Sequence, residues 1–418
     1  MKKDKVAIVG LWHLGLVTSI SLAKLGYDVT AFDEDKKLIY RLQLNEIPFH
    51  EKNIKPFLIR FKKNIKFENN FKKLKNFSKV WICYDTPINK NNLPNSNAIK
   101  RNILKISKHL KQGSTLIISS QVPLGFTKMI KKLIKKKISI SYSPENLRLG
   151  NSFKSFLKPD RIIVGVDELS NKIKLFSFFS KISKKILFVN NSSAELIKHA
   201  INAYLATSIA FSNEIGYLCE RFGANPNELV NGLRTEKRIG KKAYVRPGEA
   251  FSGGTLARDL KYLIKLSNSK NLINYIFKSV LISNNYHKNW IYEKIKFLKQ
   301  NKKIYNNDNV LFLGLSYKEN SNILRDSNIK SLINKLKKLK LNIIVFDKNQ
   351  KNKVNNNYLL LSNLYKALTV SKVIISHNEI KIMNSIKKVN LNNKIIIDYS
   401  GSLNFLSKLK DYYRFGLK

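Results

Sequence analysis

Short apolar segments of strand length alternate with a segment of helical periodicity at the start of the chain. "KVAIVG" (5–10) predicts a β-strand followed by a turn, and "LVTSISLAKLG" (16–26) has apolar residues at helical spacing. The next segment, "YDVTAFDED" (27–35), predicts a second strand that ends at Asp33. The order strand, glycine turn, helix, strand and acidic residue is typical of a dinucleotide-binding βαβ unit.

The turn departs from the G-x-G-x-x-G pattern at its middle position, where Trp12 replaces the glycine that lets the backbone approach a pyrophosphate. The Trp12 N–H remains usable if the side chain points away, so a Rossmann-like fold without a dinucleotide stays an alternative. Asp33 lies 23 residues after Gly10, and an acid there favours NAD over NADP because it repels a 2′-phosphate. The expected NAD contacts in this unit are Gly10, Trp12, His13, Leu14, Gly15 and Asp33.

Three further apolar segments end in turns that contain polar residues or proline. "KVWICYDTP" (79–87) ends in Thr86 and Pro87, "STLIISSQVPLGFT" (114–127) contains Ser120, and "ISISYSPENLRLG" (138–150) contains Glu145. In a parallel sheet the carboxyl ends of the strands carry the ligands, so these residues are predicted to converge on one crevice. We expect Thr86, Pro87 and Ser120 to contact the cofactor.

Composition limits the class of protein. The chain has 418 residues, enough for two or three domains, and a formal net charge of +49. This charge comes from 65 Lys and only 12 Arg spread along the chain, whereas nucleic-acid recognition favours Arg, so a solvated surface that attracts anionic metabolites is the better explanation. No apolar run approaches the ~18 residues of a membrane span. Two cysteines give no disulfide framework and suit a reducing cytoplasm.

Together, the ordered motifs resemble the UDP-glucose/GDP-mannose dehydrogenase family, whose patterns read G-x-G-Y-V-G, T-P, S-T-V-P-x-G-T and P-E-F-x-x-E-G. The segment 192–233 has helical periodicity, and its "AELIKHAINAYLA" and "SNE" are similar to the helix that joins the family's two halves and dominates its dimer contact. The segment 306–327 is similar to L-G-x-x-F-K-x-x-T-D-D-x-R-x-S of the family's second Rossmann-like unit. Its further strands are expected in 341–347, 371–376 and 393–401.

The resemblance spans essentially the whole chain and implies an α/β fold. Two Rossmann-like parallel-sheet domains are expected, joined by a long central helix and a helical connector. The expected boundaries are 1–190 for the NAD-binding domain, 191–297 for the central dimerisation domain and 303–418 for the nucleotide-sugar-binding domain, with a polar linker around 298–309. The resemblance also implies a homodimer that binds a nucleotide sugar, with a UDP-hexose favoured.

The family oxidises C6 of a UDP- or GDP-hexose to the carboxylate with two NAD. The first step removes a hydride from C6 and a proton from its hydroxyl. Lys198 and Asn202 of "IKHAIN", one helical turn apart, match the family residues that hold the developing alkoxide, although helix-surface polarity alone would also explain them. The substrate contacts implied by the resemblance are Arg238, Phe251, Gly253, Lys318 and Arg325.

The second oxidation in this family uses a cysteine that this chain lacks. The family loop reads P-G-x-G-x-G-G-S-C-x-x-K-D, and over 247–259 Thr255 stands in the place of the cysteine. A thiol can be poised as a thiolate, whereas an aliphatic hydroxyl needs an adjacent base. Neither Cys83 nor Cys219 falls in a matching motif. A covalent thioester step is therefore expected to be absent.

Two other family groups are also replaced. Glu145 keeps the first acid of P-E-F-x-x-E-G, but the second is Leu149, and the later D-x-R is "DYSG" (398–401), so a substrate-contacting arginine is missing. Asp259 remains and can orient water or Lys198.

Three hypotheses follow. The chain is an NAD-dependent nucleotide-sugar dehydrogenase without a cysteine, an epimerase-type enzyme that uses bound NAD for transient oxidation, or a non-catalytic binding subunit in polysaccharide synthesis. For the first, the expected catalytic residues are Lys198, Asn202, Asp259, Glu145 and Thr255.

Overall fold

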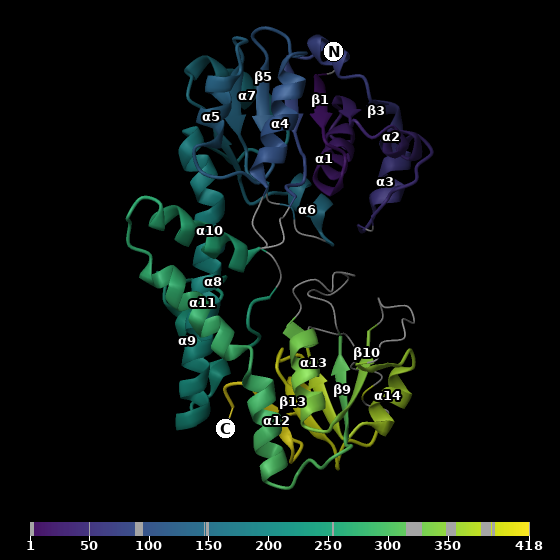
Figure 1. Cartoon of the computed structure of the whole chain (residues 1–418), viewed down its shortest axis with the longest axis vertical. Helices are drawn as coiled ribbons and strands as arrows, with labels where there is room; N and C mark the ends of the chain where they lie inside the picture. Colours follow the sequence, from purple (N-terminus) through teal and green to yellow (C-terminus); the bar gives the residue numbers. More distant parts are fainter. Residues whose placement is uncertain are drawn as a thin grey trace. The chain divides into compact units, whose positions relative to one another are not determined.

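The computed structural model describes residues 4–49, 51–87, 95–145, 147, 150–252, 255–314, 328–347, 357–377, 386 and 389–417. The chain divides into two compact units, Met1–Ala200 and Ile201–Lys418, and each contains a six-stranded parallel sheet (Figure 1). The predicted fold class is confirmed, because one long helix, α8 (Asn191–Phe222), begins in the first unit and ends in the second.

The sheet of the first unit has the strand order β3-β2-β1-β4-β5-β6, which is the doubly wound order. The order reverses between β1 and β4, and ligands of such sheets bind at the carboxyl ends of the strands at that point. The strands are β1 (Lys5–Val9), β2 (Asp28–Phe32), β3 (Ile65–Glu68), β4 (Lys79–Ile82), β5 (Thr115–Ile118) and β6 (Ser139–Tyr142).

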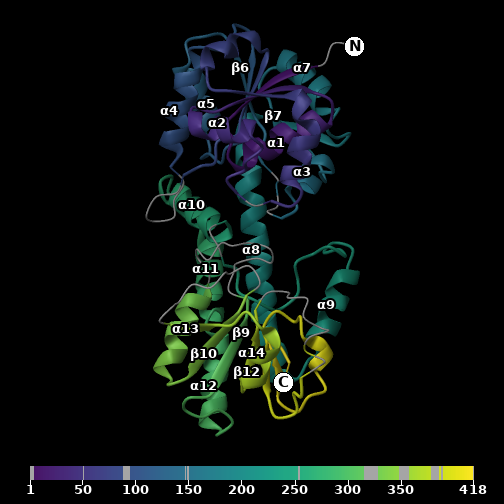
Figure 2. The ribbon, with the colours of Figure 1, turned by 90° about the vertical axis from the view of Figure 1, so that its right-hand side faces the viewer.

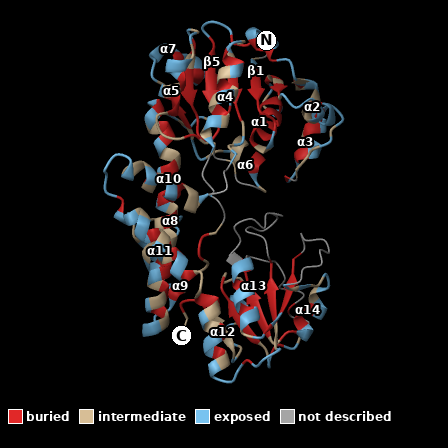
Figure 3. Cartoon of the chain, in the orientation of Figure 1, coloured by how far each residue is buried: buried red, intermediate tan, exposed pale blue. Residues whose placement is uncertain are grey.

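Helices cover both faces of this sheet, so its central strands are buried and nearly all apolar (Figure 3). Helices α1, α2, α3, α6 and α7 enclose one core cluster, and α4 and α5 enclose the other. Figure 2 shows α4 and α5 on one side and α1 and α3 on the opposite side. The helices are α1 (His13–Lys24), α2 (Lys36–Gln43), α3 (Ile54–Phe61), α4 (Ser96–Ser107), α5 (Phe126–Leu133), α6 (Ser152–Leu157) and α7 (Leu169–Phe179), with short 3₁₀ turns at Lys62–Asn64 and Phe71–Asn76. A separate pair of parallel strands, β7 (Ile162–Gly165) and β8 (Ile186–Val189), precedes α8.

The end of α8 follows from the local sequence. Gly223 has φ +77°, a left-handed conformation that suits glycine, and the side chain of Asn225 accepts the Asn227 N–H to cap the next helix, α9 (Pro226–Thr235). The helix break predicted at "FGANP" is therefore present.

Two helices after the loop 246–252 pack on α8. Small residues of α8, Ala203, Ala206 and Ala210, let α10 (Leu256–Asn268) and α11 (Tyr275–His287) approach closely. Helix α12 (Trp290–Gln300) continues into the stretch predicted as a linker.

The sheet of the second unit repeats the connectivity of the first, with the order β11-β10-β9-β12-β13-β14. Helices α12 and α13 cover one face, and α14 covers the other. The elements are β9 (Asn309–Leu313), α13 (Asn328–Lys338), β10 (Asn342–Phe346), β11 (Leu359–Leu360), α14 (Leu364–Val370), β12 (Val373–Ser376), β13 (Ile395–Asp398), a 3₁₀ turn (Asn404–Leu406) and β14 (Tyr412–Arg414). Among the helices in the described part of the chain, none is both long and apolar enough to cross a lipid bilayer.

Two helical glycines predict opposite effects of the same substitution. A Cβ at Gly216 of α8 would lie 2.5 Å from the Phe415 ring and 2.9 Å from Pro247, whereas a Cβ at Gly232 of α9 would meet nothing within 4 Å. We expect Gly216→Ala to destabilise the protein by about 2 kcal/mol through overpacking. Gly232→Ala should stabilise it by about 1 kcal/mol through helix propensity. Urea denaturation of both variants tests this, and a stable Gly216→Ala protein would contradict the packing of Phe415 against α8.

Candidate functional site

In the turn between β1 and α1, two of the three positions of the G-x-G-x-x-G pattern have no room for a side chain. Gly10 has φ +92°, and a Cβ there would lie 2.6 Å from the ring of Tyr84. A Cβ at Gly15 would lie 1.7 Å from the carbonyl oxygen of Gly10. Only glycine fits either position, so the backbone turns tightly into α1 and leaves the helix N-terminus open to a diphosphate.

Trp12 occupies the third position without backbone strain. Its φ of −74° and ψ of −156° are extended values that any residue adopts. The side chain is 48% exposed, and its ring lies 5.4 Å from that of Phe49. The tryptophan therefore changes the surface beside the turn and leaves its path unaltered.

His13 belongs to a buried polar contact that the sequence did not reveal. Its Nε2 lies 3.0 Å from Oε2 of Glu51, a carboxylate only 3% exposed. Glu51 also accepts the N–H groups of Gly150 and Ser152. Burial acts to raise the pKa of Glu51, but these hydrogen bonds outweigh it and hold the pKa below its ordinary value. Glu51 thus ties the start of α1 to the segment after β6, from 38 and about a hundred residues away in sequence.

Asp33 lies where the βαβ pattern predicts it, directly after β2. Its Oδ2 accepts the Leu11 N–H at 2.7 Å, and its Oδ1 accepts the Asp35 N–H at 3.1 Å. The carboxylate is held at the edge of the glycine turn, which is the position of the acid that binds a ribose diol in dinucleotide sites. The turn and this carboxylate together fit a dinucleotide.

Asp85 places a second carboxylate at the same turn. It follows β4 and lies near the backbone N–H of His13 at the start of α1, which favours the charged carboxylate. Crowding by protein atoms and the neighbouring Glu145 raise the pKa of Asp85 to about 6, although His13 acts in the opposite direction. Its side chain is nevertheless exposed to solvent. A cofactor diphosphate that used the same N–H would compete with this carboxylate.

The residues predicted after β4 and β5 lie close to each other. The Thr86 hydroxyl donates to the carbonyl of Gln121 at 2.7 Å, and Pro87 next to it is exposed. Ser120 is fully buried, and its hydroxyl has no hydrogen-bond partner among the described residues. Gln121 is a departure that the sequence analysis missed, because the family pattern S-T-V-P has threonine in its place.

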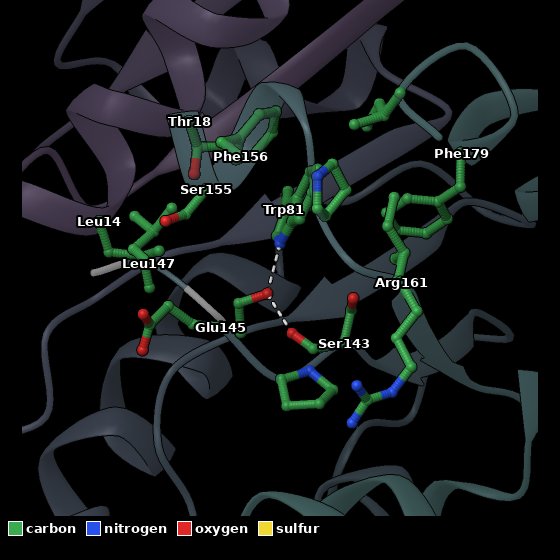
Figure 4. Close-up of a pocket in the computed structure, with 15 residues that line it drawn as sticks. Leu14, Thr18, Trp81, Ser143, Glu145, Leu147, Ser155, Phe156, Arg161 and Phe179 are labelled. Atoms are coloured by element: carbon green, nitrogen blue, oxygen red, sulfur yellow. Dashed lines mark hydrogen bonds between the residues drawn. The ribbon is translucent and has the colours of Figure 1, made fainter. Parts of the chain in front are cut away.

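A cavity of about 60 Å³ adjoins this region on the α1 face of the sheet. Trp81 donates from Nε1 to the Ser119 hydroxyl at 2.7 Å, and Ser119 donates to the Ser143 carbonyl at 2.5 Å. Figure 4 shows Glu145 and Arg161 on opposite sides of these hydrogen bonds. Leu14, predicted as a cofactor contact, also lines the cavity.

The predicted catalytic groups of α8 make different contacts in the two units. In the first, Lys198 donates from Nζ to the carbonyl of Glu145 at 2.8 Å and lies 3.9 Å from its Oε2. In the second, Asn202 donates from Nδ2 to Oδ2 of Asp259 at 2.5 Å. Asp259 is completely buried in the first turn of α10, and Nε of Arg258 lies 3.7 Å from its Oδ1.

Thr255 directly precedes α10 and is exposed. Its side chain makes no capping hydrogen bond to the helix. Both cysteines, in contrast, are buried, and burial raises the pKa of the Cys83 and Cys219 thiols. Neither thiol has the lowered pKa and the exposure of a reactive cysteine.

The loop that leads to Thr255 is fixed by buried side chains. Asn213 of α8 accepts the Gly248 N–H at 2.9 Å, and His287 of α11 donates from Nε2 to the Gly248 carbonyl at 2.6 Å. Burial lowers the pKa of His287 to about 4, so the ring is neutral near neutral pH and its Nδ1 accepts from the Tyr217 hydroxyl. Asn284 bonds both the N–H and the carbonyl of Phe251.

The predicted substrate contacts are only partly described. Arg238 is 88% exposed and pairs with Glu236 at 2.9 Å, while the ring of Phe251 is buried in the apolar cluster of α8, α10 and α11. Gly253, Lys318, Arg325 and the replaced position Leu149 lie outside the described residues.

Three domain models of one family match consecutive parts of the chain. Residues 4–184 match the NAD binding domain of the UDP-glucose/GDP-mannose dehydrogenase family, 192–286 its central domain and 311–404 its UDP binding domain. The chain belongs to this family. Its members are NAD-dependent oxidoreductases that act on the CH–OH group of nucleotide sugars, and NAD is the cofactor of the matched domain.

Individual members of the UDP-glucose/GDP-mannose dehydrogenase family are distant but cover nearly the full length. A UDP-glucose 6-dehydrogenase of Rickettsia typhi is 29% identical over 388 residues, covering 90% of this chain and 89% of the relative. The UDP-glucose 6-dehydrogenase YwqF of Bacillus subtilis is 28% identical over 354 residues, covering 82% and 79%.

Solved structures have the same fold. A UDP-glucose dehydrogenase of Pyrobaculum islandicum has a TM-score of 0.88 at 21% identity, covering 100% of this chain and 98% of its own. A UDP-D-ManNAc dehydrogenase of Pyrococcus horikoshii has a TM-score of 0.81 at 21% identity, covering 99% of each chain.

The carboxylate of Asp85 predicts that NAD binding depends on pH. Binding of the cofactor diphosphate favours neutral Asp85, so NAD affinity should rise as the pH falls through about 6, the raised pKa of this group. Asp85→Asn should tighten NAD binding about tenfold at pH 8 and remove the pH dependence near 6. Calorimetric titration measures both effects. Asp28→Asn, which removes a carboxylate at the start of β2, is the control. Unchanged affinity of Asp85→Asn at pH 8 would show that this carboxylate does not compete with the cofactor.

Proposed function

We propose that this protein is an NAD-dependent dehydrogenase that oxidises C6 of a UDP-hexose for polysaccharide synthesis, without a covalent thioester step. The observation that carries the proposal is the buried hydrogen bond between Asn202 of α8 and Asp259 of α10. It orients the Asn202 amide, which can donate to a substrate oxygen, beside α10, the helix that directly follows Thr255. UDP is favoured because the second sheet matches the family's UDP binding domain and the relatives named above act on UDP sugars.

In the first oxidation, the C6–O–H group loses a proton and its C6–H bond breaks, with the electron pair leaving as hydride. The nicotinamide of NAD supplies the hydride acceptor. Lys198 and Asn202 lie one helical turn apart on α8, so both can donate hydrogen bonds to the substrate oxygen as negative charge develops there. The buried Asp259 fixes the Asn202 amide so that its second N–H can point to the substrate.

A second oxidation requires a route other than the family's thiol adduct. Thr255 is exposed and has no histidine beside it in sequence, and both thiols of the chain are buried. Water can instead add to the aldehyde, with Asp259 orienting it, to give a hydrate whose C6–H bond is broken in the same way as in the first step. Transient oxidation by bound NAD, as in an epimerase, is the second candidate, because it needs no group at position 255.

We also propose that the protein is a homodimer that pairs through α8. Large apolar side chains recur on one face of this helix and remain exposed, namely Leu196 (40%), Tyr204 (72%), Phe211 (50%), Leu218 (52%) and Phe222 (79%). Their spacing of four to eight residues forms one stripe along the helix. A stripe of this length is unusual on the surface of a monomer.

The proposed function predicts net NADH formation and an oxidised sugar product. Purified protein is incubated with NAD and UDP-glucose, UDP-N-acetylglucosamine, UDP-N-acetylmannosamine or GDP-mannose, and NADH and product mass are measured together. We expect a UDP-hexuronate with two NADH, or the aldehyde or its hydrate with one. Lys198→Met and Asn202→Ala should each reduce turnover by about 100-fold, whereas Lys174→Met on the exposed surface of α7 should not change it.

Two further outcomes separate the candidates. Alkylating reagents should leave the activity intact, since both thiols are buried. Rapid inactivation that substrate prevents would instead show that a cysteine does the chemistry. An isomeric sugar formed without NADH would support the epimerase, and no conversion of any sugar would contradict catalysis.

The α8 stripe predicts a dimer that charge can dissociate. Light scattering at physiological salt should give a mass about twice 48.3 kDa for the wild type. The double substitution Phe211→Lys and Leu218→Lys should give monomers, because four like charges would face one another across a two-fold interface. Leu169→Lys on α7, also an exposed leucine, is the control. A wild type of 48.3 kDa would contradict the proposal.

A further inference from the structure

Two guanidinium groups of the second unit converge beside Gly401. This glycine has φ +74°, and a Cβ built on it would lie 3.0 Å from Nη2 of Arg246 and 3.4 Å from both Nε and Nη2 of Arg414. Both cations are therefore within 3.4 Å of one point. A side chain at position 401 would collide with both guanidinium groups, so glycine is what allows them to lie together beside its Cα.

Arg414 is buried although its hydrogen bonds go to neutral groups. It is 3% exposed, and it donates from Nη1 to Oδ1 of Asn404 at 2.8 Å and from Nη2 to Oδ1 of Asn227 at 3.2 Å. Within the described ranges, neither Arg414 nor Arg246 forms an ion pair with a carboxylate. Burying a cation without an anionic partner is costly, so such a residue needs a reason to persist.

The local charge remains positive even when the nearest acid is counted. Asp398 is completely buried, and its Oδ2 accepts the Leu403 N–H at 3.0 Å and the Tyr412 hydroxyl at 2.7 Å. Burial and repulsion by the neighbouring Arg246 hold the pKa of Arg414 below its ordinary value, although Tyr412 and Asp398 act in the opposite direction. A bound anion between the two guanidiniums would relieve this repulsion.

Arg414 lies near the position of an arginine that the family has and this chain lacks. The family's D-x-R motif is Asp398-Tyr399-Ser400 here, so a hydroxyl stands where the family has a guanidinium. The Ser400 hydroxyl bonds those of Ser376 and Ser402. Arg414 lies on β14 directly opposite Asp398, the last residue of β13, so a cation is present beside the turn in which the family's arginine is missing.

We propose that Arg246 and Arg414 form an anion site at Gly401 that binds the diphosphate of the nucleotide-sugar substrate, in place of the arginine missing at position 400. The choice of a diphosphate rests on the proposed function. Two guanidinium forks match a ligand with two negatively charged groups, and Arg in such a position binds phosphate oxygens in bidentate geometry.

Arg246 gives the clearest test because its side chain is exposed and makes no hydrogen bond among the described residues. Binding of UDP and of inorganic pyrophosphate to the full-length protein is measured by calorimetry, beside thermal unfolding. Arg246→Ala should weaken both ligands about 10- to 100-fold. The same substitution should leave the melting temperature unchanged or raise it, because it removes repulsion on Arg414. A purely structural arginine would lower the melting temperature without affecting binding.

The second test moves the cation from position 414 to position 400. Arg414→Ser should weaken UDP binding. Adding Ser400→Arg to that variant should restore the affinity for UDP at least tenfold, because the cation returns in the segment that follows β13, the strand next to β14. Lys338→Ala on α13 removes a positive charge elsewhere and should have no effect. If Arg414→Ser fails to fold, Arg414→Lys, which keeps the charge and loses the fork, takes its place with the same expected weakening.

The outcomes separate this inference from the proposed function. Pyrophosphate binding that depends on Arg246, without UDP binding, would support the anion site and contradict a UDP-sugar substrate. UDP binding and NADH formation that Arg246→Ala leaves unchanged, together with no rescue by Ser400→Arg, would overturn the site and leave the proposed function standing.

Discussion

Helix α8 is held by buried polar side chains in both units, and the residues proposed to do chemistry depend on that anchoring. Near its start, Glu195 is completely buried and accepts the N–H groups of Gly125 and Thr127, which begin α5. Farther along, Asn202 binds Asp259, and Asn213 binds the backbone of the loop at Gly248. Each of these groups would cost free energy if its partner moved, so the helix cannot rotate about its axis without losing several hydrogen bonds at once. The orientation of Lys198 and Asn202 is fixed by the same contacts.

The sequence predicts what depends on local periodicity and on backbone constraints. The glycine turn, the strands that flank it and the end of α8 at Gly223 follow from residues within one or two turns of each other, and all of them are present. Asp33 was predictable because the distance from the glycine turn to the acid is set by one helix and one strand.

Groups whose partners are distant in sequence could not be predicted in this way. Glu51 meets His13 and Gly150 only after the sheet has formed, and no motif marks it. Arg414 is brought close to Arg246, which is distant in sequence, only by folding. It is brought opposite Asp398 by the register of β13 and β14. The same limit applies to Asp85, since it comes near the backbone N–H of His13 only when β4 and α1 are both in place. The sequence shows that the family's arginine is missing at position 400, but the cation that faces this segment from β14 is recognisable only in the folded chain.

The charges near the proposed ligands differ in kind from the net charge of the chain. Most of the 77 basic residues are lysines on the surface, which attract anions of any shape. The Arg246–Arg414 pair instead fixes two planar donors beside a glycine, and Asp85 places a negative charge at a helix N-terminus. Both features are local and directional, unlike the diffuse charge of the surface lysines.

The loop between Arg246 and Thr255 is anchored at Gly248. Its backbone is bonded at Gly248 to Asn213 and His287, and burial keeps His287 neutral near neutral pH, so its Nε2–H remains a donor. Arg246 lies two residues before this fixed point. In a family whose chemistry at this loop depends on a thiol, a chain that has threonine there retains the anchoring of the loop and loses the nucleophile. The hydrogen bonds at Gly248 come from Asn213 and His287, so this part of the loop is anchored independently of the residue at position 255.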